Sequence, residues 1–367
     1  MLIRGDNLDV MRRLRASFAG RFRCAYLDPP FNSGRTFREY RDAWPPGAWR
    51  DMITSRLEAL APLVADDGAI FAEIDDTQLG ELLVSMDRVI GADNRVAVVT
   101  VVRSAATGHK AINRGPVNVT DFLLVYAKDR PRWRPHRVWR RRATRDRAYR
   151  TWLANPDAPP RAWTFAPLGR VAPKGADLDA FVLANARHVV RFAQPRFDAV
   201  SVEARRWIER SRAEPDRVLV LERPGYKPMI LRGGNRLLFL EDKVREEGGE
   251  RFFVEPLTNV WDDVPFQGIA AEGGVRFERN KKPERLIERV LALATSPGDW
   301  VIDPFLGSGT TAAAAHKMGR RYVGIEAGPH LDALCVPRLA RVVRGEDPTG
   351  ITRAHGWSGG GGFGLYA

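Results

Sequence analysis

The chain has 367 residues, 44% of them hydrophobic, which is enough to bury a sizeable core and to hold two domains. No apolar run reaches about 18 residues and the N-terminus lacks a signal-peptide pattern, so we expect no membrane contact and a cytoplasmic location. The formal net charge of +13, carried mainly by arginine, favours a polyanionic partner, although a GC-rich genome also enriches arginine. The histidines show no ligand spacing and the two cysteines, Cys24 and Cys335, lie far apart, which predicts buried thiols and no metal site.

Strand-like and helix-like segments alternate over the first 130 residues. Predicted strands lie at 22–27, 69–74, 96–102 and 122–127, and predicted helices at 51–64 and 77–90. The alternation is typical of a mostly parallel sheet that helices cover on both faces.

The composition and the hydrophobic periodicity of the chain change between about residues 130 and 258. Prolines cluster, charge is high and periodicity is poor, which indicates an inserted module with short strands such as 218–221 and 237–240. From Pro283 the alternation resumes, with helices at 284–295 and 310–318 and strands at 300–302 and 322–325. The glycine run 359–362 predicts a flexible tail, in which Phe363 and Tyr366 could still dock.

A glycine-rich turn, DPFLGSGTT at 303–311, stands between a predicted strand and a predicted helix. Gly307 and Gly309 allow the backbone to approach a bound nucleoside, and the helix start offers free N–H groups. Glu326 closes the next strand, where an acidic side chain commonly bonds ribose hydroxyls. The turn lacks the ending of a phosphate-binding P-loop, but it also fits the G-x-G-x-x-A pattern of NAD sites.

A second motif, Asp28-Pro29-Pro30-Phe31, follows the first predicted strand. One interpretation is a rigid turn, because consecutive prolines fix φ and remove donors. The other is chemical: the Asp28 carboxylate and the Pro29 carbonyl accept the two N–H bonds of an exocyclic base amine, and Phe31 stacks on the base. Coupled with the Asp303-Pro304 pair, this motif favours S-adenosylmethionine over NAD as the nucleoside cofactor.

Basic residues concentrate in two segments. From 130 to 150 the chain reads RPRWRPHRVWRRRATRDRAYR, arginines interleaved with Trp133, Trp139 and Tyr149. A solvated charged face is the ordinary interpretation of such a run, whereas phosphate contact with stacking is the functional one. The loop 33–49 carries Arg35, Phe37, Arg38, Tyr40 and Arg41 directly after the Asp28 motif; we expect it to be mobile without DNA and to close over a flipped nucleotide.

With these motifs in this order, the chain resembles the β-class amino-methyltransferases of DNA, and most of all the modification subunits of type III restriction–modification systems and their solitary relatives. The resemblance covers roughly residues 1–130 and 225–365, and 131–224 is not recognised. Further matching stretches are 2–8, 71–76, 122–128, 261–263, 272–275, 280–284, 347–352 and 357–363. Phe31 stands where tyrosine is usual in the family, and the chain is shorter than typical type III modification subunits.

The resemblance implies a Rossmann-like α/β methyltransferase sheet with circularly permuted motif order and an inserted target recognition domain. Its parts would be a catalytic half (1–130), a target recognition region (131–258), a cofactor-binding half (259–345) and a C-terminal tail (346–367). The strands that end at Asp28 and Asp303 would then be neighbours.

The implied site residues fall into three groups. The catalytic group is Asp28, Pro29, Pro30 and Phe31. The cofactor-binding group is Asp303, Pro304, Phe305, Gly307, Ser308, Gly309, Thr310 and Glu326, with Lys282 and Pro283 toward the methionine end and Asp6 at the pocket edge. The DNA-binding group is Arg35, Arg38, Arg137, Arg140, Arg141 and Arg142.

The expected function is transfer of a methyl group from S-adenosylmethionine to adenine N6 of a flipped base at a specific sequence in double-stranded DNA. Cytosine N4 is the alternative base; aspartate at position 28 favours adenine, because the cytosine enzymes of the group more often have serine there. A non-catalytic DNA-reading subunit is an alternative of another class, and RNA or a protein amide is a third kind of substrate. The resemblance also implies a homodimer and a nuclease subunit as candidate partners.

Overall fold

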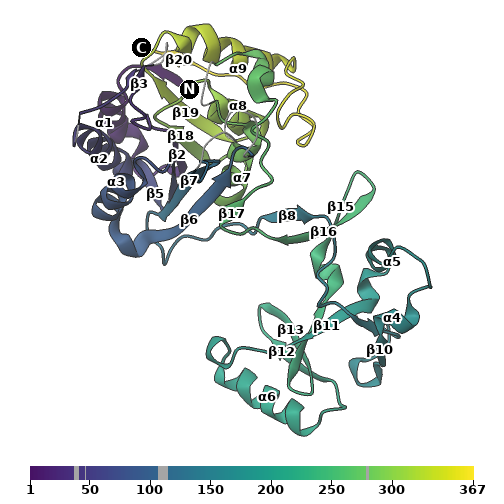
Figure 1. Cartoon of the computed structure of the whole chain (residues 1–367). Coiled ribbons are helices and arrows are strands. Elements are labelled where there is room, and N and C mark those ends of the chain that lie inside the picture. Colours follow the sequence, from purple (N-terminus) through teal and green to yellow (C-terminus); the bar gives the residue numbers. More distant parts are fainter. Residues whose placement is uncertain (37–40, 46, 106–114, 278–280) are drawn as a thin grey trace. The chain divides into compact units, whose positions relative to one another are not determined.

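The computed structural model describes residues 1–36, 41–45, 47–105, 115–277 and 281–367. Contacts divide the chain into two units, which we describe separately (Figure 1). Unit 1 comprises Met1–Val138 and Thr258–Ala367, and unit 2 comprises Trp139–Leu257. The Asp28 motif (28–31) and the glycine-rich turn (303–311) both lie in unit 1.

Unit 1 is built on a nine-stranded sheet with the order β17-β6-β7-β5-β2-β18-β19-β1-β20. Its strands are β1 (Leu2–Arg4), β2 (Phe22–Leu27), β5 (Val64–Ile74), β6 (Arg95–Val102), β7 (Thr120–Ala127), β17 (Val260–Trp261), β18 (Trp300–Asp303), β19 (Arg321–Glu326) and β20 (Leu365–Tyr366). Only β7 runs antiparallel to its neighbours, β5 and β6, among these described strands. The predicted mostly parallel α/β sheet is therefore confirmed.

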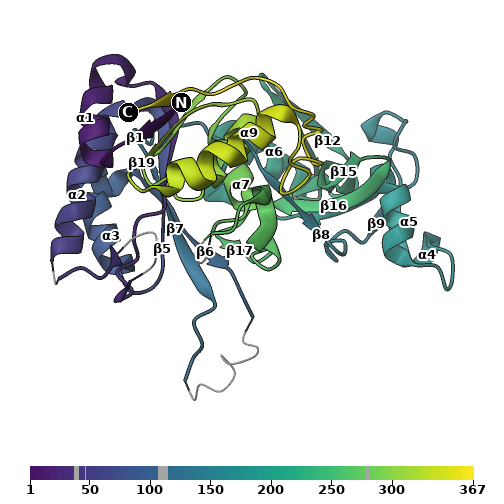
Figure 2. The ribbon, with the colours of Figure 1, turned by 90° about the horizontal axis from the view of Figure 1, so that it is seen from above.

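Helices cover both faces of this sheet. They are α1 (Asn7–Phe18), α2 (Ala48–Leu60), α3 (Leu79–Met86), α7 (Glu284–Ala294), α8 (Thr310–Lys317) and α9 (Val336–Arg344). Figure 2 shows α1, α2 and α3 along one face and α7 and α9 along the other. In α2 the buried Ile53, Leu57 and Leu60 recur at helical spacing and pack on β2 and β5. Among the described residues, no helix is both long and apolar enough to span a bilayer.

The two motif-bearing strands lie side by side, as predicted. β2 pairs in parallel with β18, with Ala25 opposite Ile302. Parallel strands end at the same edge of a sheet, so Asp28, which follows β2, and Asp303, which closes β18, stand at one edge. Both cysteines are buried free thiols, also as predicted.

The C-terminal glycine run 359–362 is not the flexible tail that its composition predicts. The backbone N–H of Gly360 donates to the Val343 carbonyl at 2.7 Å, and Leu2 N–H donates to the Gly364 carbonyl at 2.8 Å. Beyond the run, β20 pairs in parallel with β1 at the edge of the sheet. Glycine serves here for close backbone approach, so the expectation of flexibility was wrong.

Unit 2 contains two smaller sheets. One has the order β10-β9-β11-β14-β13-β12 and the other the order β15-β16-β8. Its elements are β8 (Trp139–Arg142), β9 (Thr151–Leu153), β10 (Phe165–Pro167), β11 (Val189–Ala193), β12 (Leu219–Arg223), β13 (Tyr226–Arg232), β14 (Asn235–Phe239), β15 (Val244–Glu247), β16 (Glu250–Pro256), α4 (Leu168–Val171), α5 (Leu178–Ala184) and α6 (Val202–Ala213). The short strands predicted at 218–221 and 237–240 correspond to β12 and β14.

Candidate active site

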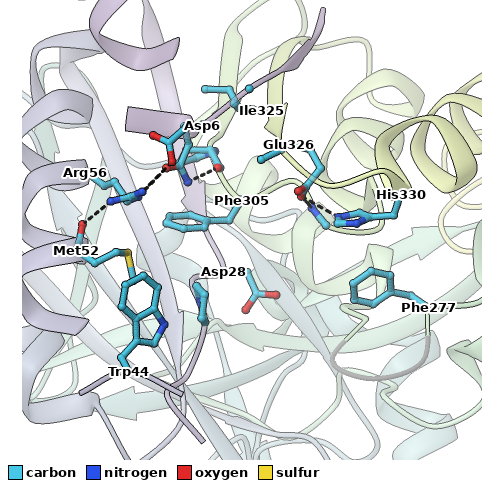
Figure 3. A pocket seen from close by; sticks show the side chains of 16 residues that line it. Asp6, Asp28, Trp44, Met52, Arg56, Phe277, Phe305, Ile325, Glu326 and His330 are labelled. Carbon is cyan, nitrogen blue, oxygen red and sulfur yellow. Dashed lines mark hydrogen bonds and ion pairs between the residues drawn. The ribbon is translucent and has the colours of Figure 1, made fainter. Parts of the chain in front are cut away.

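A pocket of about 330 Å³ opens where the neighbouring parallel strands β2, β18, β19 and β1 end (Figure 3). It is lined, among others, by predicted site residues from both motifs and from the chain start: Asp6, Asp28, Pro30, Pro304, Phe305, Gly307 and Glu326. A smaller cavity of about 30 Å³ shares Asp28, Phe305 and Gly307 with it and adds Lys282, Asp303, Ser308 and Thr310. The structure thus gathers the two distant motifs around one space.

Asp28 presents its carboxylate to this pocket, with 22% of its side chain exposed. Burial raises the pKa of Asp28 to about 7, while the ammonium group of Lys282, 2.9 Å from Asp28 Oδ1, acts in the opposite direction. Behind the turn, the indole N–H of Trp49 donates to the Pro30 carbonyl at 2.6 Å. Asp28 is therefore a fixed acceptor whose charged form is disfavoured by burial and favoured by the neighbouring ammonium group of Lys282.

Phe31 lies deeper than a stacking platform on an open pocket wall. It is 6% exposed and packs in the main hydrophobic core. The Lys282 ammonium lies 4.7 Å from the centroid of its ring. One face of the ring is thus occupied by a cation, and stacking of a base on Phe31 stays a prediction.

Glu326 organises the glycine-rich turn. Its Oε2 accepts the Gly307 N–H and its Oε1 the Gly328 N–H, each at 2.9 Å, and His330 Nε2 lies 3.1 Å from Oε2. Burial opposes ionisation, but the hydrogen bonds from His330 and the two backbone groups hold the pKa of Glu326 below its usual value. Glu326 is therefore a charged acceptor at the pocket wall.

Asp303 fixes the other side of the turn. It is 3% exposed, and its Oδ1 accepts the Phe305 N–H at 2.9 Å. Burial raises the pKa of Asp303 to about 7, although hydrogen bonds from Thr311 and Phe305 work against that rise. The side chain holds the backbone between β18 and α8 rather than pointing into the large pocket.

A buried ionic network supports the turn from behind. Arg338 Nη1 donates to Thr310 Oγ1 at 2.8 Å, and Arg338 Nη2 donates to Glu284 Oε1 at 2.8 Å. Lys317 Nζ joins Glu284 Oε2 (2.8 Å) to Asp347 Oδ2 (2.7 Å). All four charged side chains have no exposed surface, so α7, α8, α9 and the segment after α9 are tied together under the turn.

Arg338→Leu is expected to lower the free energy of unfolding by about 3–5 kcal/mol, because it leaves part of the charge of Glu284 buried and unpaired. Arg344→Leu is the matched control: Arg344 lies in the same helix and pairs with Glu346, but it is 55% exposed and should change stability little. Urea unfolding followed by circular dichroism measures both. Equal losses of unfolding free energy in the two variants would contradict the stabilising role of the buried ionic network.

Asp6 joins the start of α1 to α2, and its neighbour Asn7 reaches the segment that leads into the glycine-rich turn. Its Oδ1 accepts the Leu8 N–H at 2.9 Å and so caps α1, and its Oδ2 accepts from Arg56 Nη2 at 3.0 Å. The next residue, Asn7, donates from Nδ2 to the Pro304 carbonyl at 2.8 Å. Asp6 is thus placed at the pocket edge, where the resemblance implies it.

Four of the predicted catalytic and cofactor-binding residues line neither of these two cavities: Pro29, Phe31, Pro283 and Gly309. Pro283 precedes α7, and a Cβ on Gly309 would lie 3.4 Å from Cys335, so Gly309 serves packing against the π-helical turn Leu331–Cys335 that precedes α9. Sequence reasoning missed Arg56, Phe277 and His330 in the large pocket and Glu73 beside Asp28. None of them belongs to a chemical motif, although Glu73 stands in one of the stretches that resemble the family.

The predicted DNA-binding residues are placed only in part. Arg38, together with Phe37 and Tyr40, lies outside the described residues, and Arg35 is described only as backbone of the short strand β3 (Arg35–Thr36). The base of that loop is fixed: the buried Asp42 accepts the Asn32 N–H at 2.7 Å. The expected mobility of the loop stays a prediction.

The arginines of β8 face glutamates of β16. Arg140 Nε lies 2.5 Å from Glu255 Oε1, Arg142 lies 3.6 Å from the other oxygen of Glu255, and Arg141 pairs with Glu250. The side chains of Arg141 and Arg142 are 55% and 37% exposed. They are accessible, but their charge is partly balanced within unit 2.

The family model N6_N4_Mtase, described as DNA methylase, matches residues 22–333. The chain belongs to this DNA methylase family. Members of the family use S-adenosylmethionine as methyl donor.

Named relatives of this DNA methylase include restriction–modification proteins. One relative is a Haemophilus influenzae protein named "Probable type III restriction-modification enzyme HindVI Mod subunit". Its alignment with the chain has 29% identity and covers the whole chain and 53% of that protein. Another is the type II methyltransferase M.EcaI of Enterobacter cloacae. That alignment has 24% identity and covers 88% of the chain and 65% of M.EcaI. The chain therefore spans about half to two thirds of the length of these relatives.

Among solved structures, the cytosine-N4-specific PvuII DNA methyltransferase matches 92% of the chain and 85% of its own length, with 12% identity and a TM-score of 0.47.

Proposed function

We propose that the chain transfers a methyl group from S-adenosylmethionine to the N6 amine of a specific adenine in duplex DNA. The observation that carries the proposal is the position of Asp28: an acceptor carboxylate in the same pocket as Gly307 and Glu326 of the glycine-rich turn. Family membership supports the class of reaction.

The pocket residues fit such a cofactor. Its volume of about 330 Å³ suits a ligand of nucleoside size or somewhat larger. At Gly307 an added Cβ would meet no protein atom closer than 3.8 Å, so the space beside it belongs to the pocket. Glu326 would accept hydrogen bonds from ribose hydroxyls with the lone pairs that its three protein partners leave, and Asp6 and Phe305 would border the base.

The bound cofactor would supply a methyl group on a positively charged sulfur. Asp28 and the Pro29 carbonyl would accept the two N–H bonds of the target amine and draw its nitrogen toward tetrahedral geometry. The amine nitrogen would gain the methyl group that the donor sulfur gives up, and the proton that the amine loses would pass to Asp28 or to solvent. Positioning and electrostatics thus supply most of the rate increase.

The choice of adenine depends on residue 28. A carboxylate accepts a hydrogen bond more strongly than a hydroxyl does, and the cytosine-N4 enzymes of this group more often have serine at this position. Cytosine N4 remains the alternative substrate with the same chemistry. In either case the base must leave the duplex to reach a pocket at the sheet edge.

A DNA-reading subunit without catalysis is the alternative of another class. Calorimetry with S-adenosylmethionine, followed by transfer of a radiolabelled methyl group to plasmid DNA, tests the two. Binding together with label in DNA supports the transferase. Absence of both, in a folded protein, would favour the reader.

Unit 2 is proposed to contribute the target recognition region. The variant Arg137→Gln/Arg141→Gln/Arg142→Gln should weaken DNA binding and reduce the slope of log affinity against log salt by about 0.9 for each phosphate that the protein no longer neutralises. The control triple replaces Arg196, Arg210 and Arg217, which are ion-paired within unit 2 as Arg141 and Arg142 are, and it carries the same loss of charge. Fluorescence anisotropy over a salt series measures both. Identical slopes in the two variants would place the DNA site elsewhere.

The likeness to modification subunits motivates two further proposals. We expect the chain to act as a homodimer, which analytical ultracentrifugation would detect. A nuclease subunit is the candidate partner of a restriction–modification complex, and a solitary methyltransferase is the alternative.

A further inference from the structure

A cluster of buried charges lies beside Asp28, and its members Lys282 and Glu73 do not line the large pocket. Lys282 Nζ lies 2.9 Å from Asp28 Oδ1 and 3.1 Å from Glu73 Oε1. The Lys282 side chain is 5% exposed and that of Glu73 has no exposed surface. The hydroxyl of Tyr26 donates to the second oxygen of Glu73.

Three separate elements build the cluster. Asp28 follows β2, Glu73 lies on β5, the next strand of the sheet, and Lys282 stands just before α7. The ammonium group of Lys282 thus meets two carboxylates and the ring face of Phe31, 4.7 Å from the ring centroid. A buried ammonium with these partners has a fixed position and a fixed charge.

We propose that Lys282 is a positioning residue that keeps Asp28 ionised and aimed into the pocket, and that Glu73 competes with Asp28 for the same ammonium. The inference rests on the proposed function, in which Asp28 accepts the target amine. It gives Lys282 a different partner from the one that the family resemblance implies, because its nearest charged groups are protein carboxylates and not an open cofactor site.

The charges around Asp28 matter because its ionisation decides how well it accepts a hydrogen bond. Protonation turns one oxygen of the carboxyl group into a hydroxyl donor and removes the negative charge, so the group becomes a weaker acceptor of an amine N–H. Burial raises the pKa of Asp28, Lys282 lowers it, and the charges of Glu73 and Asp303 raise it again. Asp121, which faces Lys282 from β7, is paired with Arg103 Nε at 3.1 Å. Lys282 and Glu73 should therefore move the ionisation of Asp28 in opposite directions.

The pH profile of single-turnover methyl transfer tests the proposal. The wild-type rate should rise with pH and reach half its plateau near pH 7, the pKa of Asp28. Lys282→Met should shift this rise upward by about one unit or more, which is roughly a tenfold loss of rate below neutral pH and a much smaller loss at pH 9. Glu73→Gln should shift it downward, and Lys282→Arg should restore part of the wild-type profile.

A structural role alone would lower the rate evenly at all pH values, so unshifted profiles in both variants would overturn the proposal. If Lys282→Met does not fold, Glu73→Gln decides by itself: a profile that does not move to lower pH contradicts the inference. Carbon-13 NMR of labelled aspartate, with the Asp28 carboxyl assigned by Asp28→Asn, follows the same ionisation without any reaction. A wild-type protein that transfers no methyl group but shows these opposite NMR shifts would sink the proposed function and leave the positioning role standing.

Discussion

Asp28→Ala is expected to lower the rate of methyl transfer by roughly 10²–10³-fold or more, the cost of losing one preorganised hydrogen-bonding partner of the transition state. Affinity for S-adenosylmethionine should stay within a few-fold, because the glycine-rich turn and Glu326 are untouched. The fold should survive, since Lys282 keeps Glu73, at 3.1 Å, as its counter-ion. Single-turnover assays and calorimetry on the same preparation separate the two effects.

Two variants control this experiment. Asp121→Asn removes the same charge from a buried site near Lys282, but Asp121 does not line either described cavity and should change the rate little. Asp28→Asn keeps one carbonyl oxygen as acceptor, so its rate of methyl transfer should lie between the rates of the wild type and of Asp28→Ala. Joint loss of transfer and cofactor affinity in Asp28→Ala would mean that the Asp28 motif is a structural turn.

Gly307→Leu is expected to abolish measurable cofactor binding in a protein that still folds. The backbone of Gly307 has φ +53°, and an added Cβ would meet only the Phe305 carbonyl, at 3.8 Å, so the side chain would project into the pocket. The left-handed backbone adds a stability cost of about 1–2 kcal/mol. Calorimetry with S-adenosylmethionine and thermal melting measure both consequences.

Gly298 offers a matched control. It has φ +88° and no atom within 4 Å of an added Cβ, and it lies in the turn before β18, not among the residues that line the pocket. Gly298→Leu should therefore carry a similar backbone cost and bind the cofactor normally. Unchanged binding in Gly307→Leu would remove the glycine-rich turn from the cofactor site.

Much of the sheet could be predicted from the sequence, because its strands are short apolar runs that end at chemically distinctive residues. The parallel pairing of β2 with β18 follows from the rule that ligand-binding motifs collect at the carboxyl ends of neighbouring strands. Helix boundaries were less accurate. α2 begins at Ala48 and ends at Leu60, before a 3₁₀ turn that contains Pro62.

Two helices of unit 1 escaped prediction for a shared reason. α1 buries only Met11 completely, and its sequence, NLDVMRRLRASF, carries an aspartate and three arginines that hide its apolar face. α9 starts with a proline in its first turn and carries three arginines, of which Arg338 is fully buried in the ionic network. Burial of a charged side chain depends on partners from other segments and leaves no periodic pattern.

The site residues could be predicted only where they form a contiguous motif in the sequence. The turn at 303–311 and the Asp28 motif are contiguous, so their residue types alone suggest a nucleoside site and an amine acceptor. The ion pairs of Lys282 with Asp28 and Glu73 join three segments that are far apart in the chain, so no pattern of residue spacing predicts them. The docking of the glycine-rich tail likewise depends on tertiary hydrogen bonds that composition does not encode.

Methylation of adenine N6 can be detected in the DNA itself. Unmethylated duplex DNA is incubated with the protein and S-adenosylmethionine, digested to nucleosides and analysed by mass spectrometry. We expect N6-methyladenine, and we expect it to disappear with Asp28→Ala. N4-methylcytosine would contradict the choice of base, and no methylated base in a protein that binds the cofactor would contradict the assignment of DNA methyl transfer to this chain.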